Sequence, residues 1–142
     1  MEAAVGRQPL PAWFREITRP CVTDRRPGIY EWRIEGFGVY IGQFTRVSRP
    51  RLEYAAAVRR MTASPPLPYR RSNPNGFRAI HHALAKAVRE GMTVTLTILE
   101  NLDSKLDRNR RESELISKLR SEAAIGGLPV LNSTRTLSAA PL

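Results

Sequence analysis

The sequence predicts a single α+β domain in which a small, mainly antiparallel three-stranded sheet is flanked by helices. Two observations predict the sheet. Residues 28–35 and 37–45 alternate and are rich in β-forming residues on either side of a Gly36-Phe37-Gly38 turn, and residues 92–99 alternate apolar side chains with threonine. Apolar residues at helical spacing predict the helices. The length of 142 residues agrees with one domain.

Two segments between the second and third predicted strands have helical patterns. Residues 51–61 are compatible with a helix, and residues 77–89 place apolar side chains on one face before Gly91, which ends the helix. Residues 64–76 separate the two segments and are rich in proline, asparagine and glycine. This composition predicts a loop.

A further helix follows the third strand. Ser104 and Asp107 have the spacing of a capping box, so we expect a helix that begins there and continues to about Arg120. Gly126-Gly127 and Pro129 end that region.

These elements divide the chain into three parts. We expect the domain to cover residues 27–133, with residues 48–76 as an insertion between the hairpin and the next helix. Residues 1–26 form an N-terminal arm that packs its aromatic side chains on the domain, and residues 134–142 form a loose tail.

The charge of the chain indicates a polyanionic partner. The formal net charge is +10, and of 23 basic residues only Lys86, Lys105 and Lys118 are lysine. Arginine stays ionised and holds phosphate oxygens in pairs, so nucleic acid is the predicted partner. An arginine excess that reflects base composition of the genome is the alternative.

Other features of the sequence exclude some classes of protein. Cys21 is the single cysteine, which excludes a disulfide framework and a cysteine-based zinc site within one chain. No run of 18 apolar residues and no signal-peptide pattern occur, so we expect a cytosolic protein without a transmembrane helix.

Glu112 is the first candidate for chemistry. It shares the apolar side of its predicted helix with Ile116 and Leu119. A carboxylate in such a position needs a partner, and a single carboxylate completed by water and phosphate suits Mg²⁺. The alternative is a boundary residue that pairs with Arg108 one turn away.

Arg78 and His82 form a second candidate group. Four residues apart on the predicted 77–89 helix, they would project side by side, while His81 lies nearer the apolar edge and is expected to be structural. A guanidinium beside an imidazole could hold a phosphate and move a proton. The alternative is a solvated basic face.

Two tripeptides connect these candidates to a known family. Gly28-Ile29-Tyr30 and Tyr40-Ile41-Gly42, separated by nine residues, resemble the paired motif of the GIY-YIG nuclease superfamily. The resemblance implies a metal-dependent cut of DNA phosphodiesters with Mg²⁺ or Mn²⁺. It implies that Tyr30 acts at the reacting centre, that Tyr40 lines it, and that Glu112 binds the metal.

The resemblance extends to residues elsewhere in the chain. The Arg78–His82 spacing is similar to that of restriction endonucleases of the superfamily, and Asn132 matches a late asparagine that supports the site. Many members instead place the active-site arginine about ten residues after the second tyrosine, where this chain has Arg46 and Arg51. We favour Arg78 over Arg51 and expect Arg46 to contact phosphate. Either Tyr30 or His82 could be the base.

The sequence therefore predicts a metal-dependent DNA endonuclease, with specificity from a homodimer, a protein partner or a loop. The main alternative is a nucleic-acid-binding module of the same fold with little or no turnover. A basic RNA-contacting protein is the third possibility, based on charge alone.

Overall fold

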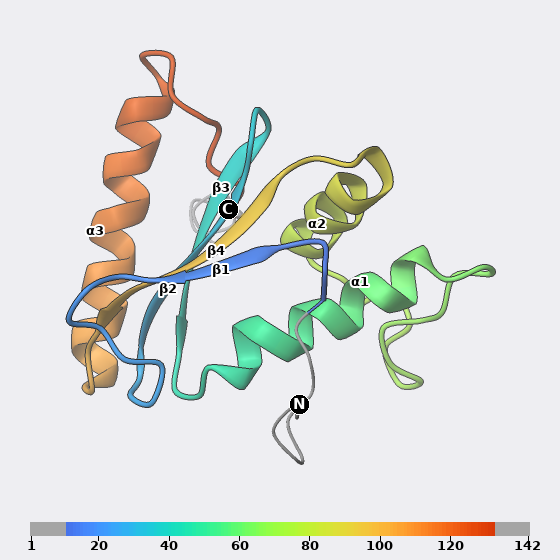
Figure 1. Cartoon of the computed structure of the whole chain (residues 1–142), viewed down its shortest axis with the longest axis horizontal. Coiled ribbons are helices and arrows are strands. Elements are labelled where there is room, and N and C mark those ends of the chain that lie inside the picture. Colours follow the sequence, from blue (N-terminus) through green and yellow to red (C-terminus); the bar gives the residue numbers. More distant parts are fainter. Residues whose placement is uncertain (1–10, 133–142) are drawn as a thin grey trace, which may run out of the picture.

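One mixed β-sheet organises the chain, as the computed structural model shows for residues 11–132 (Figure 1). Its four strands lie in the order β1-β4-β2-β3; β1 runs parallel to β4, whereas β2 is antiparallel to both β4 and β3. The strands are β1 (Arg15–Thr18), β2 (Gly28–Ile34), β3 (Gly38–Phe44) and β4 (Val94–Asn101). The predicted α+β class is confirmed.

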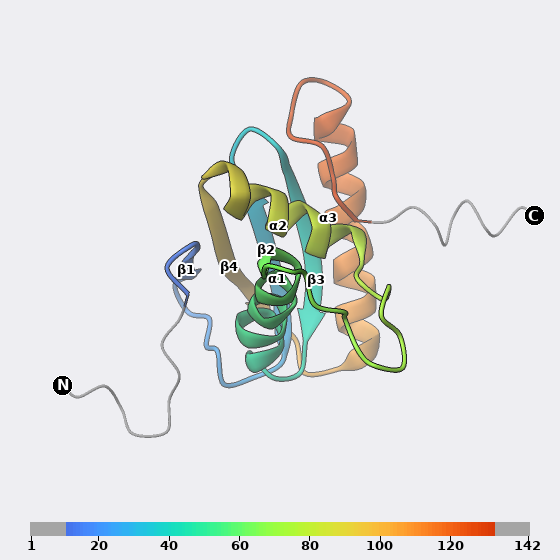
Figure 2. The same ribbon diagram turned by 90° about the vertical axis from the view of Figure 1, so that its right-hand side faces the viewer.

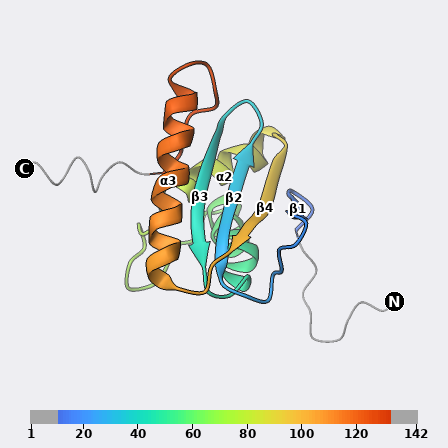
Figure 3. The ribbon, with the colours of Figure 1, turned by 90° about the vertical axis from the view of Figure 1, so that its left-hand side faces the viewer.

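Helices cover both faces of the sheet. The helices α1 (Tyr54–Thr62) and α2 (Ala79–Glu90) lie on one face, and α1 is preceded by a π-helical segment, Arg49–Glu53 (Figure 2). The long helix α3 (Lys105–Ala123) lies on the other side, next to β3 (Figure 3). The sheet therefore separates α3 from α1 and α2, and β3 is an edge strand.

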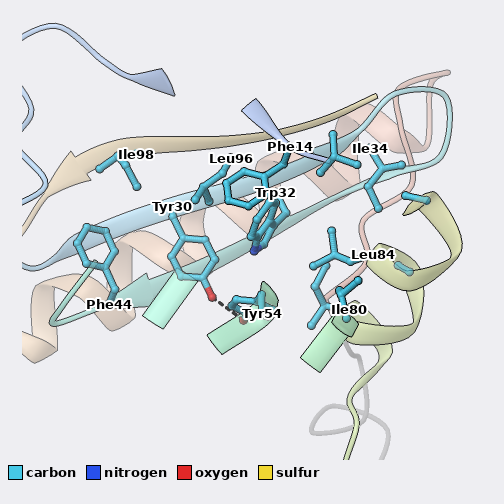
Figure 4. Packing of buried hydrophobic residues seen from close by; sticks show 14 residues of the cluster. Phe14, Tyr30, Trp32, Ile34, Phe44, Tyr54, Ile80, Leu84, Leu96 and Ile98 are labelled. Atoms are coloured by element: carbon cyan, nitrogen blue, oxygen red, sulfur yellow. Dashed lines mark hydrogen bonds between the residues drawn. The ribbon is translucent and has the colours of Figure 1, made fainter. Parts of the chain in front are cut away.

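Strand alternation divides the core between these two faces. Tyr30, Trp32 and Ile34 of β2 point toward α1 and α2 and are buried there with Tyr54 and Leu84 (Figure 4). The intervening positions of the sheet form a smaller cluster with α3, made of Ile29, Ile41, Leu99 and side chains of α3. Period-two alternation thus places the tyrosine of the first tripeptide on the α1–α2 face.

Local signals in the sequence set the helix ends. The Ser104 side chain accepts a hydrogen bond from the Asp107 backbone N–H at 3.2 Å, which fits the predicted start of α3. Gly91 adopts a left-handed conformation (φ 68°) directly after α2, which glycine tolerates without strain. The segment 64–76 contains no helix or strand, as predicted.

The sheet has one strand more than the sequence predicted. The additional strand, β1, lies within the segment predicted as an N-terminal arm and pairs with β4 from Arg15 opposite Thr95 to Thr18 opposite Ile98. It has only four residues and is largely exposed, so it lacks the alternation that marked the other strands. Just before it, Trp13 and Phe14 pack on Trp32, as the arm was expected to do.

Within residues 11–132, none of the helices has both the length and the apolar character required to cross a membrane. The predicted loose tail at 134–142 lies outside the described residues.

Candidate active site

An open cavity of about 1300 Å³ lies along the outer edge of β3. The loop before α2, one face of α3 and the segment around Leu131 line it together with β3. Four of the residues singled out from the sequence line it, namely Tyr40, Arg78, Glu112 and Asn132. Side chains from positions 92 residues apart in the chain thus meet at one place.

Arg78 links this cavity to the buried tyrosines. Its Nη1 donates to the Tyr40 Oη at 3.4 Å, and its Nη2 donates to the Tyr54 Oη at 3.0 Å. The Tyr54 and Tyr30 hydroxyls share a hydrogen bond of 2.6 Å in turn (Figure 4). Three phenols and one guanidinium therefore form a continuous hydrogen-bonded group.

The glycines of both tripeptides allow this arrangement. Tyr30 lies opposite Gly42 in the β2–β3 pair, and a β-carbon added at Gly42 would overlap the Tyr30 ring and hydroxyl. A β-carbon at Gly28 would overlap the Glu100 carbonyl of β4. The β2–β4 pairing also shifts between Ile29 and Tyr30, and such irregularities change where a side chain points.

The environment keeps the phenols protonated. Burial, with the neighbouring Tyr54 and Tyr40, raises the pKa of Tyr30 well above its ordinary value, although Arg78 opposes the shift. Burial and Tyr54 also raise the pKa of Tyr40, to which the negative charge of Glu112 adds a smaller increase. Both phenols are neutral at pH 7, and an additional positive charge would be needed to ionise either one.

Glu112 is held from the sheet rather than from its own helix. The Gln43 Nε2 donates to its Oε1 at 2.8 Å, and the Gln43 Oε1 accepts from the Arg108 Nε at 3.2 Å. Because the Gln43 oxygen faces Arg108, its amino group is directed at Glu112. Gln43 therefore connects the two α3 residues.

The alternative ion pair between Glu112 and Arg108 does not form. Arg108 is only 5% exposed and donates to the carbonyls of Leu102 and Asp103 at 3.0 and 2.7 Å. These carbonyls lie just before α3, so Arg108 fixes the connection from β4. The expected pair with Arg108 is therefore wrong, although Glu112 is partly exposed, as a boundary residue would be.

The structure does not place Arg78 and His82 side by side within a helix. Arg78 precedes the first residue of α2 and has an extended backbone, and its N–H donates to the His81 Nδ1 at 2.9 Å. His82 is exposed, packs edge-on against Phe77 and does not line the cavity. His81 is buried, as expected for a structural residue. The predicted proton-moving role of His82 stays a prediction.

The other predicted arginines lie apart from the cavity lining. Arg51 forms ion pairs with Glu16 and, at 2.7 Å, with Asp24. It therefore connects the π-helical segment to β1 and the turn that follows β1. Arg46 is exposed shortly after the end of β3, and its side chain makes no hydrogen bond or ion pair within residues 11–132.

Asn132 anchors the C-terminal segment to the sheet edge. Its Oδ1 accepts from the Ile41 N–H at 2.9 Å, and its Nδ2 donates to the Ile41 carbonyl at 2.7 Å. Val130 forms a parallel bridge with Val39 just before it. The amide thus satisfies edge groups of β3 and holds one wall of the cavity.

Two members of the site were missed from the sequence. Tyr54 lies on the same helical face as Val58 and Met61, so it resembled an ordinary core residue. Gln43 is a polar residue two positions after Ile41, on the face that packs against α3. A polar side chain at that strand position was the available signal for Gln43.

Glu112 supplies one carboxylate that a cation in this cavity could use. Gln43 makes the only hydrogen bond to the Glu112 carboxylate within the described chain. Residues 11–132 contain no group of three or more His, Cys, Asp or Glu side chains that could together hold a metal. A site with one carboxylate, completed by water and a substrate phosphate, is typical of Mg²⁺.

Comparisons of the chain with protein-family models, with curated proteins and with solved structures found no match.

Proposed function

We propose that this chain is a metal-dependent endonuclease that hydrolyses DNA phosphodiester bonds with GIY-YIG-type chemistry. The observation that carries the proposal is the convergence of Tyr40, Arg78 and Glu112 on one open cavity, with Tyr30 and Tyr54 behind Arg78. The net charge of +10 supports a polyanionic substrate.

Arg78 has the chemistry to bind the scissile phosphate. A guanidinium presents several N–H donors, and those that do not contact the two phenols remain for phosphate oxygens. Its fixed charge would stabilise the negative charge that grows on the phosphate oxygens as water attacks phosphorus and one P–O ester bond breaks. The Tyr40 and Tyr54 hydroxyls hold the Arg78 guanidinium in place before substrate binds.

The tyrosines have different positions relative to this phosphate. Tyr40 lines the cavity, so we assign to it the contact with the attacking water. Tyr30 is 1% exposed and reaches the cavity through Tyr54 and Arg78, so in this arrangement it supports the site from behind.

Glu112 would hold the divalent cation, and Gln43 would orient its carboxylate. A bound Mg²⁺ or Mn²⁺ would supply Lewis-acid stabilisation of the phosphate and the leaving oxygen.

The proposal is tested by nicking of supercoiled plasmid DNA with Mg²⁺ or Mn²⁺. Glu112→Ala should abolish cleavage while DNA binding persists. Glu114→Ala is the matched control, because Glu114 is exposed on the same helix and pairs with Arg111 at 3.2 Å, so it should cleave like the wild type. Full activity of Glu112→Ala would refute the assignment.

A second candidate is a DNA-binding module with no turnover. The raised pKa of Tyr30 and of Tyr40, caused first by burial, favours it because neutral phenols are poor bases. This candidate predicts salt-sensitive binding without cleavage products at any metal concentration.

A further inference from the structure

A second cavity, of about 470 Å³, shares the lining residue Arg78 with the first. The start of the α1 region, the loop before α2 and the first turn of α2 line it. Its charged lining residues are four arginines and one carboxylate, namely Arg49, Arg60, Arg70, Arg78 and Glu53. Tyr54, Tyr69 and His81 form its aromatic walls.

The cationic groups of this cavity are available to a ligand. Within the part of the chain that the structure describes, the side chains of Arg49, Arg60 and Arg70 form no ion pair or hydrogen bond, in contrast to Arg51 and Arg111. The Arg70 guanidinium lies 5.0 Å from the centre of the Tyr69 ring, a contact that orders it at the rim.

His81 adds no charge to this lining. Burial, together with Arg78, His82 and Arg49, lowers the pKa of His81 to about 4, so the imidazole is neutral at pH 7. Its Nδ1 accepts a hydrogen bond from the Arg78 backbone N–H at 2.9 Å, which fixes the backbone of the residue that lines both cavities. The cavity therefore combines excess positive charge with neutral aromatic walls.

We propose that this cavity binds a second backbone phosphate of the DNA strand whose scissile phosphate lies at Arg78. The proposal rests on the proposed function, which puts DNA in the larger cavity. Arg78 lines both cavities and donates to Tyr40, a lining residue of the larger one, and to Tyr54, a lining residue of the smaller one. A strand that crosses Arg78 would therefore bring a neighbouring phosphate to the free arginines, whose forks match phosphate oxygens.

Two pairs of consecutive arginines provide a charge-matched test. Arg60 and Arg70 line the cavity, whereas the adjacent Arg59 and Arg71 do not, and all four are exposed. The variants R60A/R70A and R59A/R71A remove the same charge from the same helix and the same loop. Binding to a short fluorescent DNA duplex is measured in EDTA over a salt series, after thermal melts show that both variants fold.

The two variants should differ in salt dependence. If the cavity arginines together neutralise one phosphate, R60A/R70A should reduce the slope of log K against log salt by about 0.9 and weaken binding roughly 10-fold at 0.1 M salt. R59A/R71A should keep the wild-type slope. R60K/R70K should keep it as well, because lysine retains the positive charge. Equal slopes for R60A/R70A and R59A/R71A would overturn the proposal, as would a slope change seen with duplex RNA but not with DNA.

The cleavage assay separates this inference from the proposed function. If the wild type shows no metal-dependent cleavage but the slopes differ as stated, the phosphate site stands and the nuclease assignment fails. If the wild type cleaves DNA but the two double variants bind alike, the nuclease assignment stands and the second phosphate site is wrong.

Discussion

Removal of the Tyr54 hydroxyl should destabilise the protein more than removal of the Tyr30 hydroxyl. The Tyr54 Oη has two partners, the Tyr30 Oη at 2.6 Å and the Arg78 Nη2 at 3.0 Å. Within the described residues, Tyr54 is the only hydrogen-bond partner of the Tyr30 hydroxyl. Tyr54→Phe therefore leaves the buried Tyr30 hydroxyl without a partner and removes an acceptor of Arg78, whereas Tyr30→Phe leaves the Tyr54 hydroxyl still accepting from Arg78.

This difference sets the expected magnitudes. An unsatisfied buried hydroxyl lowers the free energy of unfolding by about 1–3 kcal/mol, so Tyr54→Phe should fall in that range or slightly above it. Loss of one satisfied hydrogen bond costs about 0.5–1.5 kcal/mol, which is the range expected for Tyr30→Phe. The double variant lacks both hydroxyls, so neither is left without a partner. Its decrease in the free energy of unfolding should therefore be smaller than the sum of the decreases in the single variants.

Urea unfolding of the wild type, both single variants and the double variant measures these differences, provided that the dependence of the unfolding free energy on urea stays the same. A loss for Tyr30→Phe equal to or greater than that for Tyr54→Phe would refute the reasoning. Additive losses in the double variant would show that the two hydroxyls are not coupled.

Two further predictions concern Glu112 and His81. Gln43→Ala removes the donor to the Glu112 carboxylate, so the Mg²⁺ concentration needed for half-maximal plasmid cleavage should rise about 10- to 100-fold; an unchanged requirement would show that Gln43 does not position Glu112. The pKa of His81 is lowered by burial first, from 6.5 to about 4, so the unfolded chain binds more protons between these values and the folded protein should lose on the order of 3 kcal/mol as pH falls across them. Urea unfolding at several pH values should show this loss diminished in His81→Asn and retained in the exposed His82→Ala, and the opposite pattern would contradict it.

The regular elements of this fold were predictable because their signals are local. Residues 28–34, 38–44 and 94–101 alternate in the sequence as they do in the sheet, and Ser104 marks the start of α3. The strand β1 was missed because its four largely exposed residues form a strand only through pairing with β4, which is distant in the sequence. Such pairing leaves no pattern in the strand itself.

The types of residue in the candidate site were predictable from the sequence, but their hydrogen-bond partners were not. Glu112 was identifiable because a carboxylate on the apolar side of a helix needs a partner, and Arg78 was identifiable from its spacing to His82 and from the family resemblance. Both Glu112 and Arg78 line the same cavity. The sequence placed Arg78 inside a helix beside His82, whereas α2 begins one residue later and His81 contacts Arg78 instead. Tyr54 has the helical spacing of a core residue, so only its three-dimensional position reveals the contact with Arg78.

The rate of metal-dependent plasmid cleavage by Arg78→Ala beside Arg51→Ala tests the central claim most directly. Arg78 contacts the phenols at the cavity, whereas Arg51 is paired with Glu16 and Asp24. Arg78→Ala should lower the cleavage rate about 10²- to 10³-fold with the fold intact, because it removes charge from the phosphate site. Arg51→Ala should lower stability but cleave at close to the wild-type rate at a temperature where it is folded. Loss of cleavage in Arg51→Ala with full activity in Arg78→Ala would contradict the account.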